Sequence, residues 1–287
     1  MLGDVPSPDP WLTAAHALRY ELQTRHRQAE DAAFGALLGR MRRGELTPED
    51  VTTLRSRIVS RAAADALGDS VVRLYSRNAQ VDAYNARRLA RLSAASEHVY
   101  VYRASVEPKR IAGARAAADV ARDGRAEMLR RMRVLPTTTL RTGARVMLLA
   151  NVDLELGLAN GSTGTVIGFT EPSTTLAPMP IVAFDHGITT SVAPRTWKFE
   201  AETEFRGSFT QVPLVLAYAL TTHKAQGLTL RSVLIDCSPE SQFDYHMAFV
   251  GVSRATSLAG VYFSAFSSSA VRTLRKVREF YDAIAAA

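Results

Sequence analysis

The chain has 287 residues, of which 47% are hydrophobic, enough for one large domain or two smaller ones with a real core, and this argues against global disorder. Basic residues outnumber acidic ones, 35 to 28, and the net charge of +7 favours a polyanionic partner only weakly. The single cysteine, Cys237, excludes a disulfide framework and a cysteine-based metal site. No apolar run reaches the length of a membrane span and no signal peptide is visible, so we expect an intracellular protein without a targeting signal.

The first part of the chain is predicted to be mostly helical, with two strands. Thr47 to Asp50 has the features of a helix start, a threonine cap followed by proline and acidic residues. Asn78 is a candidate N-cap, because its side chain can accept hydrogen bonds from open backbone donors. In chain order we expect helices over 11–39 and 50–66, a strand over 71–76, a helix over 81–92, a strand over 99–104 and a basic helix over 109–133.

From residue 137 to about 211, turn signals recur at short intervals and β-branched residues are frequent, which predicts a small all-β unit. Asn160-Gly161 is the strongest hairpin-turn signal in the sequence. Asp185-His186-Gly187 predicts a second tight turn. The expected strands lie over 144–149, 163–169, 181–184 and 188–192.

The last part of the chain alternates apolar and polar stretches. An apolar run over 214–220 is consistent with the start of a helix, and the polar segment Thr222 to Gly227 interrupts it. Strands are predicted over 233–237 and 261–266, with helical spacing over 245–255 and a terminal helix over 272–281. This alternation favours a parallel sheet covered by helices. The polar segment and Arg254 then lie at element ends, where such sheets bind ligands.

Two stretches in this last part resemble motifs of superfamily-one DNA helicases. The residues His-Lys-Ala-Gln-Gly-Leu-Thr at 223–229 resemble motif V, and Val-Ser-Arg-Ala-Thr-Ser-Leu at 252–258 resemble motif VI. The amino-acid sequences of these two motifs are most similar to those of the PIF/RecD group, which moves 5′ to 3′ on single-stranded DNA. Arg27-Gln28 resembles the pair that follows the third motif of this family. The stretches 143–148 and 160–166 resemble the Src-homology-3-like barrel that these helicases insert into their second motor domain.

The resemblance implies the C-terminal half of a PIF/RecD-like ATP-dependent DNA helicase. The fold would be α/β, a RecA-like domain of the P-loop NTPase type with a parallel sheet, formed by 1–136 and 212–287 and interrupted by an inserted small all-β barrel over 137–211. Roles in DNA repair, DNA recombination and telomere maintenance follow from it. So does a place in the nucleus or mitochondrion of a eukaryote, or in the cytoplasm of a bacterium.

The family also assigns roles to individual residues. Arg254 would be the arginine finger on the ATP γ-phosphate and Arg27 a second such cation, because a planar, always-charged guanidinium suits phosphoryl transfer. Their simpler interpretations are a helix-capping arginine and an ordinary surface arginine beside Arg25. The nucleotide would also be sensed by Gln226 and Gly227. Single-stranded DNA would be held by Thr222, His223, Lys224, Thr229 and Asn78.

The 287 residues contain no Gly-x-x-x-x-Gly-Lys-Ser/Thr motif and no apolar strand that ends in Asp-Glu. We therefore expect the phosphate-binding loop and the ligands of Mg²⁺ on a first RecA-like domain, missing here and supplied in cis or in trans. The chain by itself is expected to be inactive toward ATP. The alternative is a non-catalytic nucleic-acid-binding or scaffold remnant of a truncated helicase. An RNA substrate also stays open.

Overall fold

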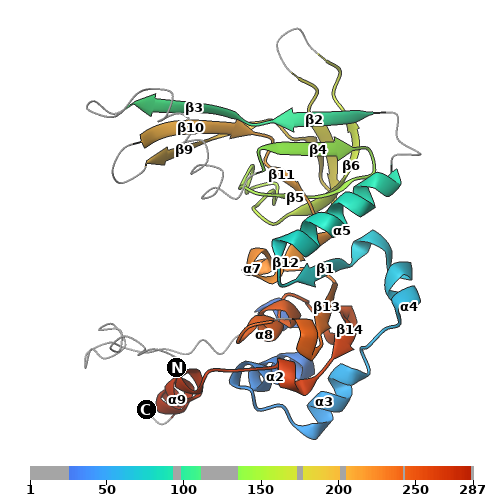
Figure 1. Ribbon diagram of the computed structural model, residues 1–287, viewed down its shortest axis with the longest axis vertical. Coiled ribbons are helices and arrows are strands. Elements are labelled where there is room, and N and C mark those ends of the chain that lie inside the picture. The colour runs from blue at the N-terminus through green and yellow to red at the C-terminus, as the bar shows by residue number, and fades with distance from the viewer. Residues whose placement is uncertain are drawn as a thin grey trace.

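The computed structural model describes residues 26–92, 98–110, 135–172, 177–200, 205–241 and 243–285. Figure 1 shows two parts, an α/β part that contains β1, β13 and β14 and a part made almost entirely of strands. Residues 11–25 of the first predicted helix lie outside the described residues, and so do residues 111–133 of the predicted basic helix. Residues 109 and 110, where that basic helix was predicted to begin, instead end a strand.

A four-stranded parallel sheet forms the centre of the α/β part. Its strands are β1 (Val72–Tyr75), β12 (Ala219–Thr221), β13 (Val233–Cys237) and β14 (Val261–Phe266), in the order β12-β1-β13-β14. The early strand β1 lies between β12 and β13, with Leu74 opposite both Leu220 and Ile235. Two distant parts of the chain therefore complete one sheet. The expectation of a parallel α/β sheet is confirmed.

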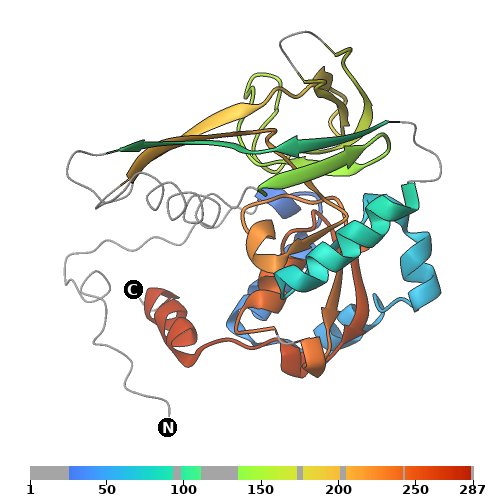
Figure 2. The same cartoon turned by 45° about the horizontal axis from the view of Figure 1, so that its top comes forward.

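Helices pack against this sheet because their apolar faces join its core. Phe34 and Met41 of one helix are buried in the same cluster as Phe263 of β14. Figure 2 shows the long helix α5 running across the sheet toward the strand-rich part. The α-helices are α2 (Ala32–Arg43), α3 (Pro48–Arg55), α4 (Arg61–Ala66), α5 (Asn78–Arg91), α7 (Thr222–Ala225), α8 (Met247–Val252) and α9 (Arg275–Ala285).

The helix predicted over 50–66 is wrong in one respect, because it is two helices. Between α3 and α4, Ile58 forms a parallel bridge with Phe263, and the amide of Val59 donates to the Phe263 carbonyl at 2.8 Å. This local pairing with the edge of β14 replaces the helical hydrogen bonds. The predicted start at Thr47 is confirmed, since Thr47 and Asp50 form a reciprocal capping box.

The strand-rich part consists of antiparallel sheets. One has the order β11-β5-β6-β7-β8, another β3-β10-β9, and the third β2-β4. Apolar side chains of the first and third of these sheets, such as Leu140, Val146, Val166 and Val182, form a second core, and Phe209 of the sheet β3-β10-β9 lies in a separate small cluster. The strands are β2 (Val99–Arg103), β3 (Ser105–Arg110), β4 (Thr137–Arg141), β5 (Arg145–Leu148), β6 (Thr163–Phe169), β7 (Pro180–Phe184), β8 (Thr189–Ser191), β9 (Arg195–Glu200), β10 (Phe205–Gln211) and β11 (Leu214–Leu216).

Strand pairing crosses both predicted limits of the all-β unit. Strands β2 and β3 precede residue 137 but pair with β4 and β10, and β11 follows residue 211 but pairs with β5. The division into 1–136, 137–211 and 212–287 stays a prediction, as does the barrel. We call all strands from β2 to β11 together the β unit.

Two local predictions in this region are wrong. The apolar run over 214–220 is not the start of a helix but contributes to β11 and β12, because each end of it finds a strand partner. Asn160-Gly161 is not a two-residue hairpin turn, because fourteen residues separate β5 from β6. Gly161 instead closes that longer loop by donating its amide to the Leu148 carbonyl at 2.9 Å. The Asp185–Gly187 turn is confirmed.

Among the helices that the structure describes, none is long and apolar enough to cross a membrane.

The capping box gives a first testable prediction. Asp50 is buried and accepts two hydrogen bonds from the Arg40 guanidinium, at 2.6 and 2.7 Å. These bonds, with that from the Thr47 amide, outweigh burial and hold the pKa of Asp50 below its ordinary value. The stabilisation is therefore present above about pH 4 and is lost as pH falls through the folded-state pKa. Asp50→Asn should lower the free energy of unfolding by about 1 kcal/mol at neutral pH and flatten its decline in acid.

Denaturant titrations at several pH values test this. Asp65→Asn is the matched control, because Asp65 also pairs with an arginine, Arg73, but its side chain is 53% exposed. If both variants show the same small change, the Asp50 carboxylate does not stabilise the fold as stated.

Candidate functional site

Arg254 follows helix α8, and its side chain folds back against the main chain. It is 9% exposed. Its Nε donates to the Val250 carbonyl at 2.8 Å, one terminal nitrogen donates to the Leu228 carbonyl at 3.4 Å, and the other donates to Ser253 Oγ at 2.7 Å. The guanidinium is thus held by neutral acceptors of its own helix and of the segment that follows α7.

Arg27 reaches the same place from far away in the sequence. It lies in the short 3-10 helix η1 (His26–Gln28). Its Nε donates to Thr229 Oγ1 at 3.0 Å, and a terminal nitrogen donates to the Ser253 carbonyl at 3.3 Å. Ser253 therefore contacts both predicted arginines. Sequence reasoning placed them in one site only through the family resemblance, and the geometry brings them together.

The electrostatics of this pair favour an anion. Burial, and then the nearby charge of Arg27, lower the pKa of Arg254 to about 10, and burial also lowers the pKa of Arg27. Both groups remain charged at neutral pH. Within the described part of the chain, no carboxylate forms an ion pair with either guanidinium. Two like charges without a counterion repel each other, and a bound phosphate would relieve that repulsion.

A cavity of about 240 Å³ opens beside the arginine pair. It gives a small anionic group access to both guanidiniums, and Phe249 and Leu38 supply apolar wall. The lining residues are His26, Arg27, Gln28, Leu38, Gly39, Arg42, Phe249, Ser253 and Arg254.

Two residues that sequence reasoning did not include in the site hold η1 and α2 against the Arg254 segment. The buried amide of Gln28 donates to the carbonyls of Ser253, at 3.2 Å, and Ala255, at 2.7 Å. Asp31 accepts the Phe34 amide at 2.9 Å as the N-cap of α2 and, through its other oxygen, the Leu258 amide at 3.0 Å. The resemblance at Arg27-Gln28 pointed to Gln28. No sequence signal indicated that Asp31 bonds to Leu258.

The segment Thr222–Thr229 starts at the carboxyl end of β12. The hydroxyl of Thr221 caps α7 by accepting the Lys224 amide at 3.2 Å. Thr222 is buried and its hydroxyl donates to the Tyr75 carbonyl at 3.4 Å, so this side chain serves the sheet. His223, Gln226, Gly227 and Thr229 are exposed and Lys224 is half-buried. Gly227 has φ 88°, a left-handed conformation that glycine adopts without strain.

Asn78 lies at the first position of α5 and is exposed. Its predicted capping role is wrong, because Arg77 occupies the N-cap position and no side chain caps the helix. The helix nevertheless starts just after β1, and Tyr75 at the end of β1 lies opposite Thr221 at the end of β12. Helices α5 and α7 therefore begin next to each other, at the carboxyl ends of the neighbouring strands β1 and β12.

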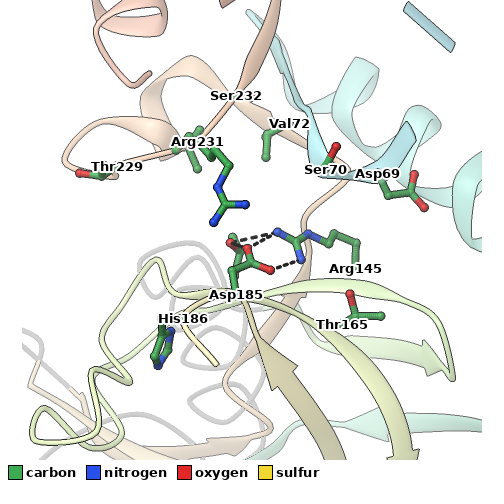
Figure 3. Close-up of a pocket in the computed structure, with 12 residues that line it drawn as sticks. Asp69, Ser70, Val72, Arg145, Thr165, Asp185, His186, Thr229, Arg231 and Ser232 are labelled. Carbon is green, nitrogen blue, oxygen red and sulfur yellow. Dashed lines mark hydrogen bonds and ion pairs between the residues drawn. The ribbon is translucent and has the colours of Figure 1, made fainter. Parts of the chain in front are cut away.

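A cavity of about 540 Å³ separates the β unit from the other end of the sheet (Figure 3). Arg145 donates to Asp185 at 2.6 Å, and Arg231 extends toward this pair from the opposite wall. Burial opposes ionisation of Asp185, but hydrogen bonds from Arg145 and Thr163 outweigh it, so the pKa of Asp185 lies below its ordinary value. Of the predicted site residues, Thr229 alone lines this cavity.

Comparison with known proteins relates this geometry to helicases. Residues 133–169 match the family model described as the 2B domain of DNA helicase Pif1. The chain is 39% identical over 142 residues to the ATP-dependent DNA helicase PIF1 of Xenopus laevis, which covers 50% of this chain and 22% of the relative. It is 29% identical over 298 residues to PIF1 of Emericella nidulans, covering 88% of this chain and 38% of the relative. The chain thus spans less than two fifths of the length of these relatives.

Solved structures agree over most of the chain. The crystal structure of Pif1 helicase from Candida albicans matches with a TM-score of 0.68 and 27% identity, over 91% of this chain and 60% of that one. Pif1 helicase from Bacteroides in complex with ADP-AlF3 and single-stranded DNA matches with a TM-score of 0.61 and 25% identity, over 93% and 57%. The fold is therefore that of the RecA-like helicases. Within that class the chain is similar to a part of the Pif1 helicases, and the predicted resemblance to the PIF/RecD group is confirmed.

The buried amide of Gln28 gives a second prediction. Gln28→Ala removes the donor to two main-chain carbonyls and should lower the free energy of unfolding by about 1–3 kcal/mol. Titration with guanidinium chloride measures the shift, with an unchanged dependence on denaturant. Gln226→Ala is the control, since Gln226 is exposed at the end of α7. Equal effects of the two substitutions would contradict the role given to Gln28.

Proposed function

We propose that the chain is the second motor domain of an ATP-dependent DNA helicase that moves 5′ to 3′ on single-stranded DNA. One observation carries this proposal. Two guanidiniums without a carboxylate partner among the described residues meet at Ser253, and both also contact the segment Leu228–Thr229, which continues from the exposed His223. A single stretch of chain thus joins a site suited to a phosphate with a site suited to a nucleic-acid backbone.

On the nucleotide side, Arg254 and Arg27 are proposed to bind the γ-phosphate of ATP. Charge on the phosphoryl oxygens grows in the transition state, and a guanidinium fork stabilises it through paired hydrogen bonds. Arg254 is held only by neutral oxygens, so it can exchange some of them for phosphate oxygens. Gln226 and Gly227, on the exposed turn after α7, would sense the nucleotide.

The ATP-bound Mg²⁺ is proposed to be held by another domain. Within the described residues no cluster of three or more His, Cys, Asp or Glu side chains is placed to hold a metal ion. Asp31, the acidic residue adjacent to the arginine site, already accepts two backbone amides with its two oxygens. The first RecA-like domain, in cis or in trans, would supply the phosphate-binding loop and the carboxylates for this ion.

On the DNA side, His223 and Lys224 are proposed to hold phosphates of a single strand, with Thr229 and Asn78 nearby. These polar side chains lie near two neighbouring strand ends. There they can contact the phosphates of a nucleic-acid strand without contacting its bases. Thr222 would act here through its main chain, since its hydroxyl bonds to the sheet. Binding should fall steeply with salt, as counterions are released.

A scaffold or nucleic-acid-binding protein without catalysis is the second candidate. Its basis is that the arginine pair and the exposed polar segment can bind a nucleic-acid backbone without any turnover of ATP. The two candidates differ in one measurement, the ATPase rate of the chain joined to a first motor domain that carries such a loop. DNA-stimulated turnover supports the motor, and none supports the scaffold.

The third prediction concerns Arg254. In the joined protein, Arg254→Ala should lower ATP turnover by about 10³-fold, the range of arginine fingers, with a much smaller change in nucleotide affinity. Arg254→Lys should restore only part of the rate, because lysine lacks the planar fork. Arg231→Ala, an exposed arginine on the other side of Thr229, should keep the rate. The 287-residue chain alone should release no phosphate from ATP. A lysine variant at the wild-type rate would refute the finger.

The fourth prediction concerns His223. His223→Ala should weaken binding of a single strand by about 1 kcal/mol if the ring makes one phosphate hydrogen bond. It should also reduce the stimulation of ATP turnover by DNA. Fluorescence anisotropy across a salt series and the ATPase assay measure both effects, with His98→Ala as an exposed histidine outside the site. Unchanged affinity together with unchanged stimulation would show that His223 has no such role.

A further inference from the structure

The β unit and the segment after β12 share a cleft of about 260 Å³. One wall comes from β5 and from the loop between β5 and β6 that contains Gly161, and the other from α7 and the residues just after it. The lining residues are Met147, Leu149, Asn160, His223, Lys224, Gln226 and Leu228. We propose that this cleft receives one base of a single-stranded nucleic acid whose phosphate lies at His223 and Lys224. This rests on the proposed function and adds a base subsite, with Asn160 as its new contact residue.

The two walls are built against each other. Gly161 has φ 96°, and a Cβ at this position would lie 2.2 Å from Cδ2 of Leu228. No larger residue allows this approach without displacing the Leu228 side chain. Hydrogen bonds fix the loop, from the Gly161 amide to Leu148 and from the Asn160 amide to Asn151 Oδ1 at 2.8 Å. On the other wall, the Leu228 amide donates to the Ala225 carbonyl at 3.0 Å.

The chemistry of the lining suits one nucleotide of a strand. Met147, Leu149 and Leu228 offer apolar surface to the face of a base, and such stacking tolerates every base. Lys224 supplies positive charge, and both Lys224 and His223 can donate hydrogen bonds to the adjoining phosphate. Asn160 is exposed, and its side-chain amide, which both donates and accepts, has no hydrogen-bond partner among the described residues.

The volume of the cleft favours a base of a polymer over a complete small molecule. Pockets for complete small molecules measure about 300–1,000 Å³, and this cleft is smaller. A base fits while its sugar and phosphate stay at the rim, which the exposed His223 and half-buried Lys224 occupy. A polymer that places successive bases along the surface is therefore a better occupant than a free nucleotide.

The same wall leads to the arginine pair. The Leu228 carbonyl accepts a hydrogen bond from Arg254, and the Thr229 hydroxyl accepts one from Arg27. A base resting on Leu228 therefore contacts a residue whose main chain holds Arg254. This gives the β unit a direct role in communication between the strand and the arginines, through Gly161.

The test compares two labelled strands in fluorescence anisotropy, an oligothymidine and the same strand with abasic sites, on the full 287-residue chain. The wild-type chain should bind the oligothymidine at least about fivefold more tightly, the lower end of base stacking. Asn160→Ala and Gly161→Ala should reduce this preference toward one. Gly187→Ala should keep it, because Gly187 has the same φ of 96° but no neighbouring atom within 4 Å of the place that a Cβ would take.

The outcomes are distinct. If the wild-type chain binds both strands equally, or if Asn160→Ala keeps the full preference, the base subsite is refuted while binding itself stands. If the wild-type chain binds neither strand at low salt, the proposed function fails, and the subsite fails with it. Thermal unfolding checks each variant. Should Gly161→Ala not fold, Asn160→Ala decides the question, since its side chain is exposed.

Discussion

The structure depends on Ser253 as the meeting point of two like charges. Its carbonyl accepts hydrogen bonds from Arg27 and Gln28, and its hydroxyl accepts one from Arg254. Partly buried cations repel each other, and the oxygens of the main chain offset only part of that repulsion. Hydrogen bonds to neutral oxygens hold both guanidiniums in place. The pair can still attract an anion, because no carboxylate among the described residues neutralises it.

The rest of the fold serves this meeting point. Strand β1 lies between two strands that follow it by more than a hundred residues, so the early segment with Arg27 is brought to the late segment with Arg254. Asp31 strengthens the junction, because one carboxylate caps α2 and also accepts the Leu258 amide. The β unit contacts the same region from the other side, at Leu228. The proposed nucleotide site, the proposed strand site and the β unit therefore converge on residues 222–229.

Much of this could be predicted from the sequence where local patterns carry the information. The strands over 233–237 and 261–266 are short apolar runs with polar ends, and both are found. The run over 214–220 was predicted to start a helix, and this was wrong because pairing with β1 and β5 makes its two ends strands. Arg27 and Arg254 were placed together only by resemblance. The roles of Gln28 and Asp31 could not be predicted, because their hydrogen-bond partners lie some 225 residues away in the sequence. The burial of Thr222 could not be predicted either, because it depends on the neighbouring strand β1.

The central claim is that one segment, Leu228–Thr229, links the anion site to the strand site. The most direct measurement is the affinity for a labelled single strand of this chain joined to a first motor domain, with and without saturating ADP-aluminium fluoride. Because both arginines bond to this segment, an anion that draws them away should change strand affinity, by several-fold for a coupling of about 1 kcal/mol. An identical affinity with and without the bound analogue, while both ligands bind, would contradict the account.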